Sequence, residues 1–174
     1  MKSLYESILS STKSGKEAYY VHAIDKMLES GVADKKLIVD LEKQVAVYKV
    51  NNNNIQSLIR TYIGLAGNAC SLNWIDTSEV TNMHDTFQNL KFNGDISKWD
   101  VSSVKDMNYM FASSNFNGNI SKWNVRKVKD MYAMFFDSSF NRDISTWKVN
   151  DKVCHDDMFL DCPIKEEYKP KFKR

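Results

Sequence analysis

The sequence is poor in proline, glycine and cysteine, and it has no long hydrophobic run. Two prolines and six glycines occur in 174 residues, of which 12% are aromatic, so the composition does not indicate disorder. No stretch approaches the roughly 18 consecutive apolar residues that a membrane-spanning helix needs. The sequence therefore predicts a folded chain without a membrane span, built as one domain or as one repeat array with a helical extension.

An excess of charge of either sign is also lacking. The chain carries 24 Lys and Arg residues against 22 Asp and Glu residues, which gives a formal net charge of +2. Such a balance creates no strong field toward nucleic acid or an anionic membrane surface. We therefore expect a protein partner and keep nucleic acid as a less favoured alternative.

Cysteines are few and irregularly placed. Cys70, Cys154 and Cys162 are odd in number and follow no spacing typical of a disulfide framework, which favours a reducing compartment. Near the start of the sequence, Glu6 and three serines interrupt the apolar stretch that a secretory signal requires. These features predict a cytoplasmic protein, with the cell surface, a secreted effector and a virion as alternatives.

Residues 1–68 have helical periodicity and predict an N-terminal cap or bundle. Apolar residues from Lys16 to Ser30 recur at helical spacing, and Gly31 stands where that helix should end. Asp34 is placed to cap the next helix. A short first helix over Ser3–Ser11 is also predicted. The apolar face of the helix after Asp34 is predicted to contain Leu37, Ile38, Leu41, Val45 and Tyr48.

The run Asn51–Asn54 is predicted to break this pattern and to precede a further helix that ends near Gly67. That helix should bury Ile55, Leu58, Ile59, Tyr62 and Ile63.

From about residue 70 the sequence repeats itself every 24 residues. Trp99, Trp123 and Trp147 follow one another at that interval, and Trp74 precedes them by 25. The same period relates Val80, Val104 and Val128; Met83, Met107 and Met131; Phe87, Phe111, Phe135 and Phe159; Phe92, Phe116 and Phe140; and Ile96, Ile120 and Ile144. One unit cannot enclose its own apolar side chains, so each unit must stack on the next and share a core.

Spacing within the unit suggests its local structure. Ile96-x-x-Trp99-x-Val101 has the spacing of a strand, and the positions from Val104 to Phe111 suit a turn that leads into a short helix. Asparagines at 93, 117 and 141 are expected to turn the chain and to bond backbone groups there.

The stretch from Phe92 to Phe111, F-N-G-D-I-S-K-W-D-V-S-S-V-K-D-M-N-Y-M-F, resembles the BspA-like leucine-rich repeats of bacterial surface proteins. Residues 116–135 and 140–159 repeat it with decreasing fidelity, and the resemblance covers about residues 72–162. It implies a solenoid used for protein–protein contact, often in adhesion, without catalytic machinery.

We therefore predict an α+β fold: a short right-handed leucine-rich-repeat-like solenoid of about 3.5 coils of about 24 residues, with an N-terminal α-helical cap or bundle. The expected divisions are residues 1–68 for the helical section, 69–164 for the solenoid and 165–174 for a basic tail. For this tail a solvated terminus is favoured over contact with an acidic partner.

The predicted partner-binding face consists of the residues that flank each Trp. Its members are Lys98, Asp100, Lys122, Asn124, Arg126, Thr146 and Lys148, with Ser102 and Asn150 beside them. The face is mildly basic, and the competing interpretation is an ordinary solvated surface that carries solubilising lysines. Loops and the helical section compete with it as binding surfaces.

Other patterns have a structural interpretation that we prefer to a chemical one. The Trp series could stack on ligands and the Met series could bind a soft metal, but both keep the phase of the core residues. Cys154, His155 and Cys162 offer too few ligands for zinc and lie too close in sequence for a nucleophile and its base. The Gly94–Asp95 turn has no calcium ligand set that is kept in later units.

Common catalytic motifs are also lacking: the sequence has no Gly-rich phosphate loop, no H-E-x-x-H and no G-x-S-x-G. We therefore predict a protein-binding module that is not an enzyme and that has neither a cofactor nor a metal. An adhesin-like role follows from the resemblance, and an intracellular or phage-type binder that occludes a host protein is the alternative.

Overall fold

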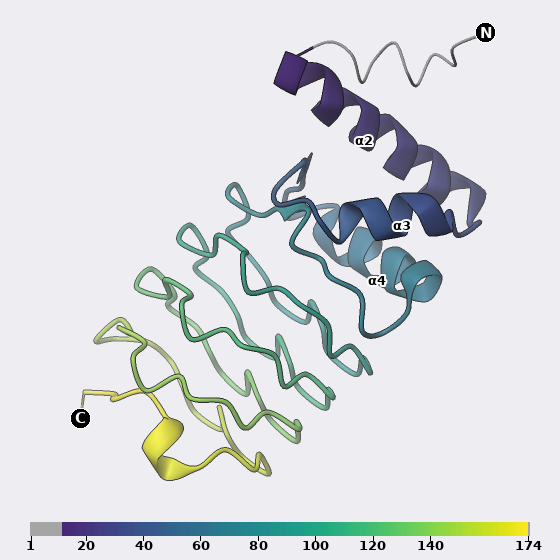
Figure 1. The fold of residues 1–174 in the computed structure, drawn as a ribbon. Helices are drawn as coiled ribbons and strands as arrows, with labels where there is room; N and C mark the ends of the chain where they lie inside the picture. Colours follow the sequence, from purple (N-terminus) through teal and green to yellow (C-terminus); the bar gives the residue numbers. More distant parts are fainter. Residues whose placement is uncertain (1–11, 174) are drawn as a thin grey trace, which may run out of the picture.

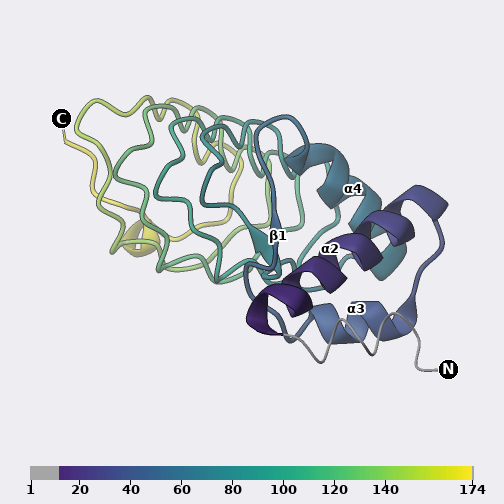
Figure 2. The same ribbon diagram turned by 90° about the horizontal axis from the view of Figure 1, so that it is seen from above.

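The computed structural model describes the backbone of residues 12–173, with side chains from residue 19 onward. Three helices lie at one end of a stack of coils, and the chain leaves at the opposite end (Figure 1). Seen from above, the same helices cover only that end of the stack (Figure 2). The helix predicted over Ser3–Ser11 lies outside the described residues.

The first described helix, α2, spans Thr12–Ser30 and ends as predicted at Gly31. Gly31 has a φ of 64°, and its N–H donates to the Met27 carbonyl at 3.1 Å. Helix α3, Lys35–Leu41, is capped as predicted, because Asp34 Oδ1 accepts from the backbone N–H of Leu37 at 2.9 Å.

Helix α3 is shorter than predicted, since it stops at Leu41. Val45 is 54% exposed, and Tyr48 belongs to strand β1, Tyr48–Lys49, so the predicted helical face over these two residues is wrong. Strand β1 pairs in parallel with β2, Ile75–Asp76. Backbone pairing to a segment far along the sequence has overridden the local helical pattern.

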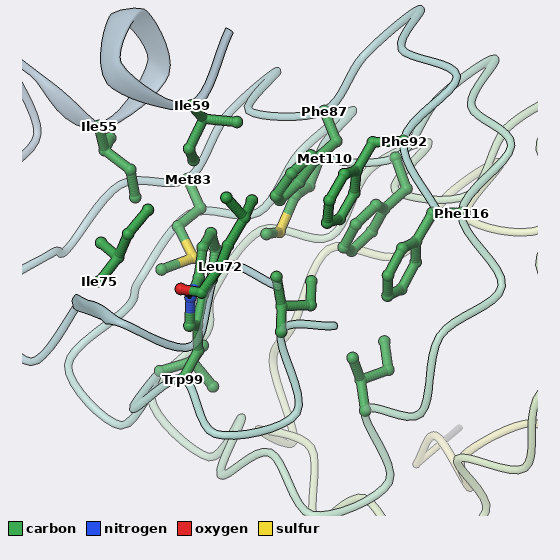
Figure 3. Packing of buried hydrophobic residues seen from close by; sticks show 14 of the residues in the cluster. Ile55, Ile59, Leu72, Ile75, Met83, Phe87, Phe92, Trp99, Met110 and Phe116 are labelled. Carbon is green, nitrogen blue, oxygen red and sulfur yellow. Dashed lines mark hydrogen bonds between the residues drawn. The ribbon is translucent and has the colours of Figure 1, made fainter. Parts of the chain in front are cut away.

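Helix α4, Ile55–Ala66, covers the first coil of the stack. All five residues predicted to be buried in this helix are buried, and Gly67 follows it with a φ of 91°. Ile55 and Ile59 project from α4 toward Ile75 and Met83 (Figure 3). Gln56 Nε2 donates to the carbonyl of His84 at 2.5 Å, so α4 occupies the place where a preceding coil would lie.

Backbone hydrogen bonds join residues 23 to 25 positions apart and hold the coils in register. The N–H of Met83 donates to the Asp106 carbonyl at 2.8 Å, and Met131 donates in the same way to Cys154 at 2.8 Å. Isolated parallel bridges run through Asn82, Asp106, Asp130 and Cys154. The repeat seen in the sequence is therefore the spacing between neighbouring coils.

Aromatic side chains stack along the interior. The rings of Trp99 and Trp123 lie 6.4 Å apart, and those of Trp123 and Trp147 lie 6.5 Å apart, with interplanar angles of 2° and 8°. Each indole is at most 5% exposed, and the N–H of Trp99 donates to the Leu72 carbonyl in the preceding coil at 2.9 Å. The prediction that the Trp series belongs to the core is confirmed. Phenylalanines form a second series beside it (Figure 3).

The segments around Trp99, Trp123 and Trp147 are successive turns, so the strands predicted there are wrong, whereas β2 directly follows Trp74. The Trp99 N–H donates to Ile96, and the Val104 N–H donates to Val101, at 3.2 and 3.0 Å. The predicted short helices are also turns. We use the name arcs for the four segments that replace the predicted short helices, residues 83–90, 107–114, 131–138 and 155–162.

Every arc holds two residues with positive φ, four positions apart. They are Asp85 and Asn89, Tyr109 and Ser113, Ala133 and Asp137, and Asp157 and Asp161. The left-handed residues turn alternate N–H groups toward the next coil, whereas the N–H groups between them close turns within the same coil. A continuous helix would direct every N–H along its own axis and would leave the coils unpaired.

The asparagine series links coils. Asn93 Oδ1 accepts from the backbone N–H of Asn117 at 2.8 Å, and Asn117 Oδ1 accepts from that of Asn141 at 3.0 Å. The predicted backbone bonding is confirmed, although these bonds cross from coil to coil instead of closing a single bend.

The C-terminal tail packs against the last coil, which makes the predicted solvated terminus wrong. The Tyr168 carbonyl accepts from the N–H of Ile144 at 3.0 Å, and the Phe172 ring stacks on His155 at 3.8 Å. No helix between Thr12 and Lys173 is both long enough and apolar enough to cross a membrane.

Gly94 allows a close approach between neighbouring parts of the backbone, which gives a first prediction. A Cβ atom there would lie 1.9 Å from the Cys70 carbonyl oxygen and 2.6 Å from the Phe92 ring. We expect Gly94→Ala to lower the free energy of unfolding by about 1–3 kcal/mol, because backbone must move. Gly64→Ala in α4 is the matched control: nothing lies within 4 Å, so stability should rise slightly. Urea unfolding measures both, and an unchanged Gly94→Ala midpoint would contradict the packing.

Candidate functional site

The predicted binding residues lie together along the stack, although turns and not strands place them. All seven are exposed in the structure. One shallow hollow of about 260 Å³ is lined by Ser121, Lys122, Trp123, Asn124, Val125, Arg126, Thr146 and Lys148. A second, of about 170 Å³, is lined by Ser97, Lys98, Asn119 and Lys122. We call the seven predicted residues the Trp-flanking face.

Its positive charges have no acidic partner in contact. Among the described residues, no ion pair of 4.0 Å or less includes Lys98, Lys122, Arg126 or Lys148. Asp100 is the one acidic residue of the face. The surface therefore presents four cations and one carboxylate to solvent, without the mutual neutralisation that a solubilising mixture of charges provides.

Asp100 and Asn124 also shape the backbone. Asp100 Oδ1 accepts from the N–H of Ser102 at 2.9 Å, and Asn124 Oδ1 accepts from that of Arg126 at 3.4 Å. Asp76 makes the equivalent bond to Ser78 at 3.0 Å in the coil before. These side chains stabilise Asx turns, so the groups left free for a partner are chiefly the lysines and the arginine.

Sequence reasoning missed another hollow, of about 460 Å³, beside this face. Its lining consists of Asn119, Ser121, Asn141, Arg142, Asp143, Thr146 and Tyr168. Asn119 and Asp143 belong to another series of Asx turns, and hydrogen bonds from Ser145 lower the pKa of Asp143. The period of Asp95, Asn119 and Asp143 was a usable signal for part of this hollow. Tyr168 comes from the tail, which carries no repeat.

The Cys–His cluster is dispersed in the structure. Cys154 is exposed, His155 stacks on Phe172, and Cys162 Sγ lies 3.2 Å from the Phe140 carbonyl. Over the residues that the structure describes, no three His, Cys, Asp or Glu side chains are arranged to hold a metal ion. The Gly94–Asp95 turn packs against the Cys70 carbonyl, and Asp95 Oδ1 accepts from the Ser97 N–H at 2.9 Å.

Two tyrosine hydroxyls and one cysteine thiol with raised pKa values lie at the junction between the helices and the coils. Burial and a hydrogen bond to Asp25 raise the pKa of Tyr48 to about 12. Burial also raises the pKa of Tyr62. Burial raises the pKa of Cys70 to about 12. Groups that hold their protons in this way pack the junction and are not nucleophiles at neutral pH.

A model of the family described as "Mycoplasma protein of unknown function, DUF285" matches residues 47–170. The match begins at strand β1 and includes helix α4 as well as the repeats, so it crosses the predicted boundary at residue 68. No curated protein matches the chain. No solved structure matches it either.

The role of Asp100 in its turn can be separated from its charge. Asp100→Ala should lower the free energy of unfolding by about 0.5–1.5 kcal/mol, because the Ser102 N–H loses its acceptor. Asp100→Asn should stay within about 0.5 kcal/mol of the natural protein, since Asn124 fills the equivalent position in the next coil. Thermal unfolding measures both; equal effects of the two changes would contradict the turn role.

Thiol reactivity should follow burial. At pH 8 we expect iodoacetamide to modify Cys154 first, Cys162 more slowly and Cys70 last, because Cys70 is 3% exposed and its pKa is about 12. Mass spectrometry of tryptic peptides gives the three rates, and labelling in urea supplies the unfolded reference. Modification of Cys70 at the rate of Cys154 in the folded protein would show that the junction is open.

Proposed function

We propose, from the premise that this chain belongs to the DUF285 family of Mycoplasma proteins, that it is a non-enzymatic module that binds another protein through its Trp-flanking face. The proposal includes a leucine-rich-repeat-like solenoid of the BspA type as the scaffold. The period of 24 residues and the in-register Trp rings support that scaffold.

The observation that carries the proposal is the row of unpaired cations over two adjoining hollows. Lys122 lines both hollows, so Lys98, Arg126 and Lys148 form one continuous surface with it. Shallow, open hollows suit the surface of a folded partner better than a small molecule, which favours deeper and more apolar clefts.

The chemistry of the face defines the partner. Four cations facing solvent attract a protein surface that is rich in Asp and Glu, and they speed its diffusional encounter at low salt. The stacked coils hold these cations in fixed order, because each coil is bonded to the next through its backbone and its aromatic rings. Little backbone ordering entropy is then lost on binding, and the remaining entropy cost is that of fixing the Lys and Arg side chains.

Two settings fit this activity. The resemblance to bacterial surface repeats supports adhesion to a protein of another cell. All three cysteines are free thiols, which supports the second setting, a binder inside a reducing compartment that occludes its target.

Charge reversal tests the face. The variant with Lys98→Glu, Lys122→Glu, Arg126→Glu and Lys148→Glu should lose at least about tenfold in affinity, since four attractive contacts become repulsive. Purified protein is cross-linked to lysates of Mycoplasma and, separately, of cultured animal cells, and captured proteins are quantified by mass spectrometry. The lysate that yields the partner distinguishes the two settings.

A second variant reverses four exposed lysines that line neither hollow: Lys26→Glu, Lys35→Glu, Lys91→Glu and Lys129→Glu. It carries the same change of charge and should capture the partner as the natural protein does. An equal loss of capture in both variants would show that net charge alone causes the effect. Undiminished capture by the first variant would reject the Trp-flanking face as the binding surface.

A further inference from the structure

The last arc, residues 155–162, carries a row of backbone N–H groups without acceptors. In each of the three arcs before it, four alternate N–H groups donate to carbonyls of the following coil at 2.8–3.2 Å. The equivalent donors of the last arc are the N–H groups of His155, Asp157, Phe159 and Asp161, and none of them has a hydrogen-bond acceptor among the residues that the structure describes.

This row keeps the backbone shape of the paired arcs. Asp157 and Asp161 have φ values of 54° and 56°, and Ala133 and Asp137 in the preceding arc have 49° and 50°. The turns inside the last arc are also closed, since the N–H of Met158 donates to His155 at 3.2 Å. The four donors are therefore already oriented for pairing, as the edge strand of a sheet is.

The tail, residues 165–173, covers two side chains of this arc but offers no carbonyl to its row of N–H groups. It bonds to the N–H of Ile144 through Tyr168, and it contacts the side chains of His155 and Phe159 through Phe172 and Lys169. Asp157 and Asp161 remain exposed, as does Leu160, which is 48% exposed. The outer edge of the arc thus has apolar and polar side chains in contact with solvent.

We propose that this edge receives a segment of a partner protein, which adds to the stack as one further arc. The segment must offer backbone carbonyls on alternate residues, because those are the groups that the inner arcs bind. It should also be basic: Asp156, Asp157 and Asp161 are exposed on the arc, and within residues 12–173 no cation pairs with them inside 4.0 Å.

A second copy of this chain does not supply an accessible row of backbone carbonyls. The corresponding carbonyls of its first arc face helix α4, from which Gln56 donates to His84. Two last arcs placed together would set donors against donors. The occupant that we propose is therefore not a second copy of this chain.

Amide hydrogen exchange tests the open row in the free protein. The amides of residues 155, 157, 159 and 161 should exchange on the order of 100-fold faster than those of Met131, Ala133, Phe135 and Asp137, which are bonded to the next coil. Equal protection of the two sets would overturn the proposal, because the last arc would then already be covered.

Binding is tested with a synthetic peptide of residues 127–139 that carries Asp130→Lys and Asp137→Asn, an inner arc made basic. Added to ¹⁵N-labelled protein, it should shift and protect those four amides, and a scrambled peptide should not. Asp156→Asn, Asp157→Asn and Asp161→Asn together should weaken binding about fivefold or more, since three charge pairs are lost while Asn still accepts positive φ.

The control variant changes three exposed carboxylates elsewhere, Glu29→Gln, Glu42→Gln and Glu167→Gln, and should bind the peptide unchanged. Shifts confined to other amides, or no shifts, would overturn the proposal. Protection that grows with protein concentration in the absence of peptide would assign the edge to self-association and would overturn the partner. The charge-reversed Trp-flanking variant should keep the response, so failure here is separate from failure of the proposed function.

Discussion

Backbone pairing between coils is the interaction on which the rest of the structure depends. A coil of 24 residues is too short to enclose its own Trp and Phe rings, so it is stable only against a neighbour. Alternate N–H groups of each arc donate to the next coil, and this fixes the register at which the rings meet. The register in turn places Lys98 and Lys122 at equivalent points on adjoining coils, so the binding surface is a consequence of core packing.

The period of 24 residues predicted the stack and the buried Trp series, and apolar residues at helical spacing predicted α2 and α4. Both patterns are repeated over many residues. The local conformation inside a coil could not be predicted in this way. Ile96-x-x-Trp99-x-Val101 fits a strand in a short window, yet Asx and backbone turns close it instead. Val45 and Tyr48 continued a helical pattern, but pairing with Ile75 decided their structure. That pairing leaves no mark in the local sequence.

The candidate face was predictable for the same reason as the stack, since its residues keep a constant phase relative to Trp. The sequence did not reveal that Asp100 and Asn124 each use a side-chain oxygen to accept a hydrogen bond within their own turn. A residue that recurs beside a core position can be there to shape the backbone or to meet a partner. The distinction needs the hydrogen bonds, and it leaves the lysines and Arg126 as the groups available for recognition.

The two ends of the stack are closed in unlike ways. At the first coil, α4 replaces a preceding coil by apolar side chains, and this substitution is incomplete: Trp74 Nε1 and Tyr62 Oη are buried without a well-aligned hydrogen-bond partner. In every later coil the indole N–H finds a carbonyl, as Trp99 finds that of Leu72. A buried, unpaired donor costs about 1–3 kcal/mol, which the helix must offset by the apolar area it covers. At the last arc the tail covers the side chains of His155 and Phe159, but among residues 12–173 no carbonyl accepts from the N–H groups of residues 155, 157, 159 and 161. One end is thus closed by hydrophobic burial, and the other retains the pairing groups that the interior of the stack uses.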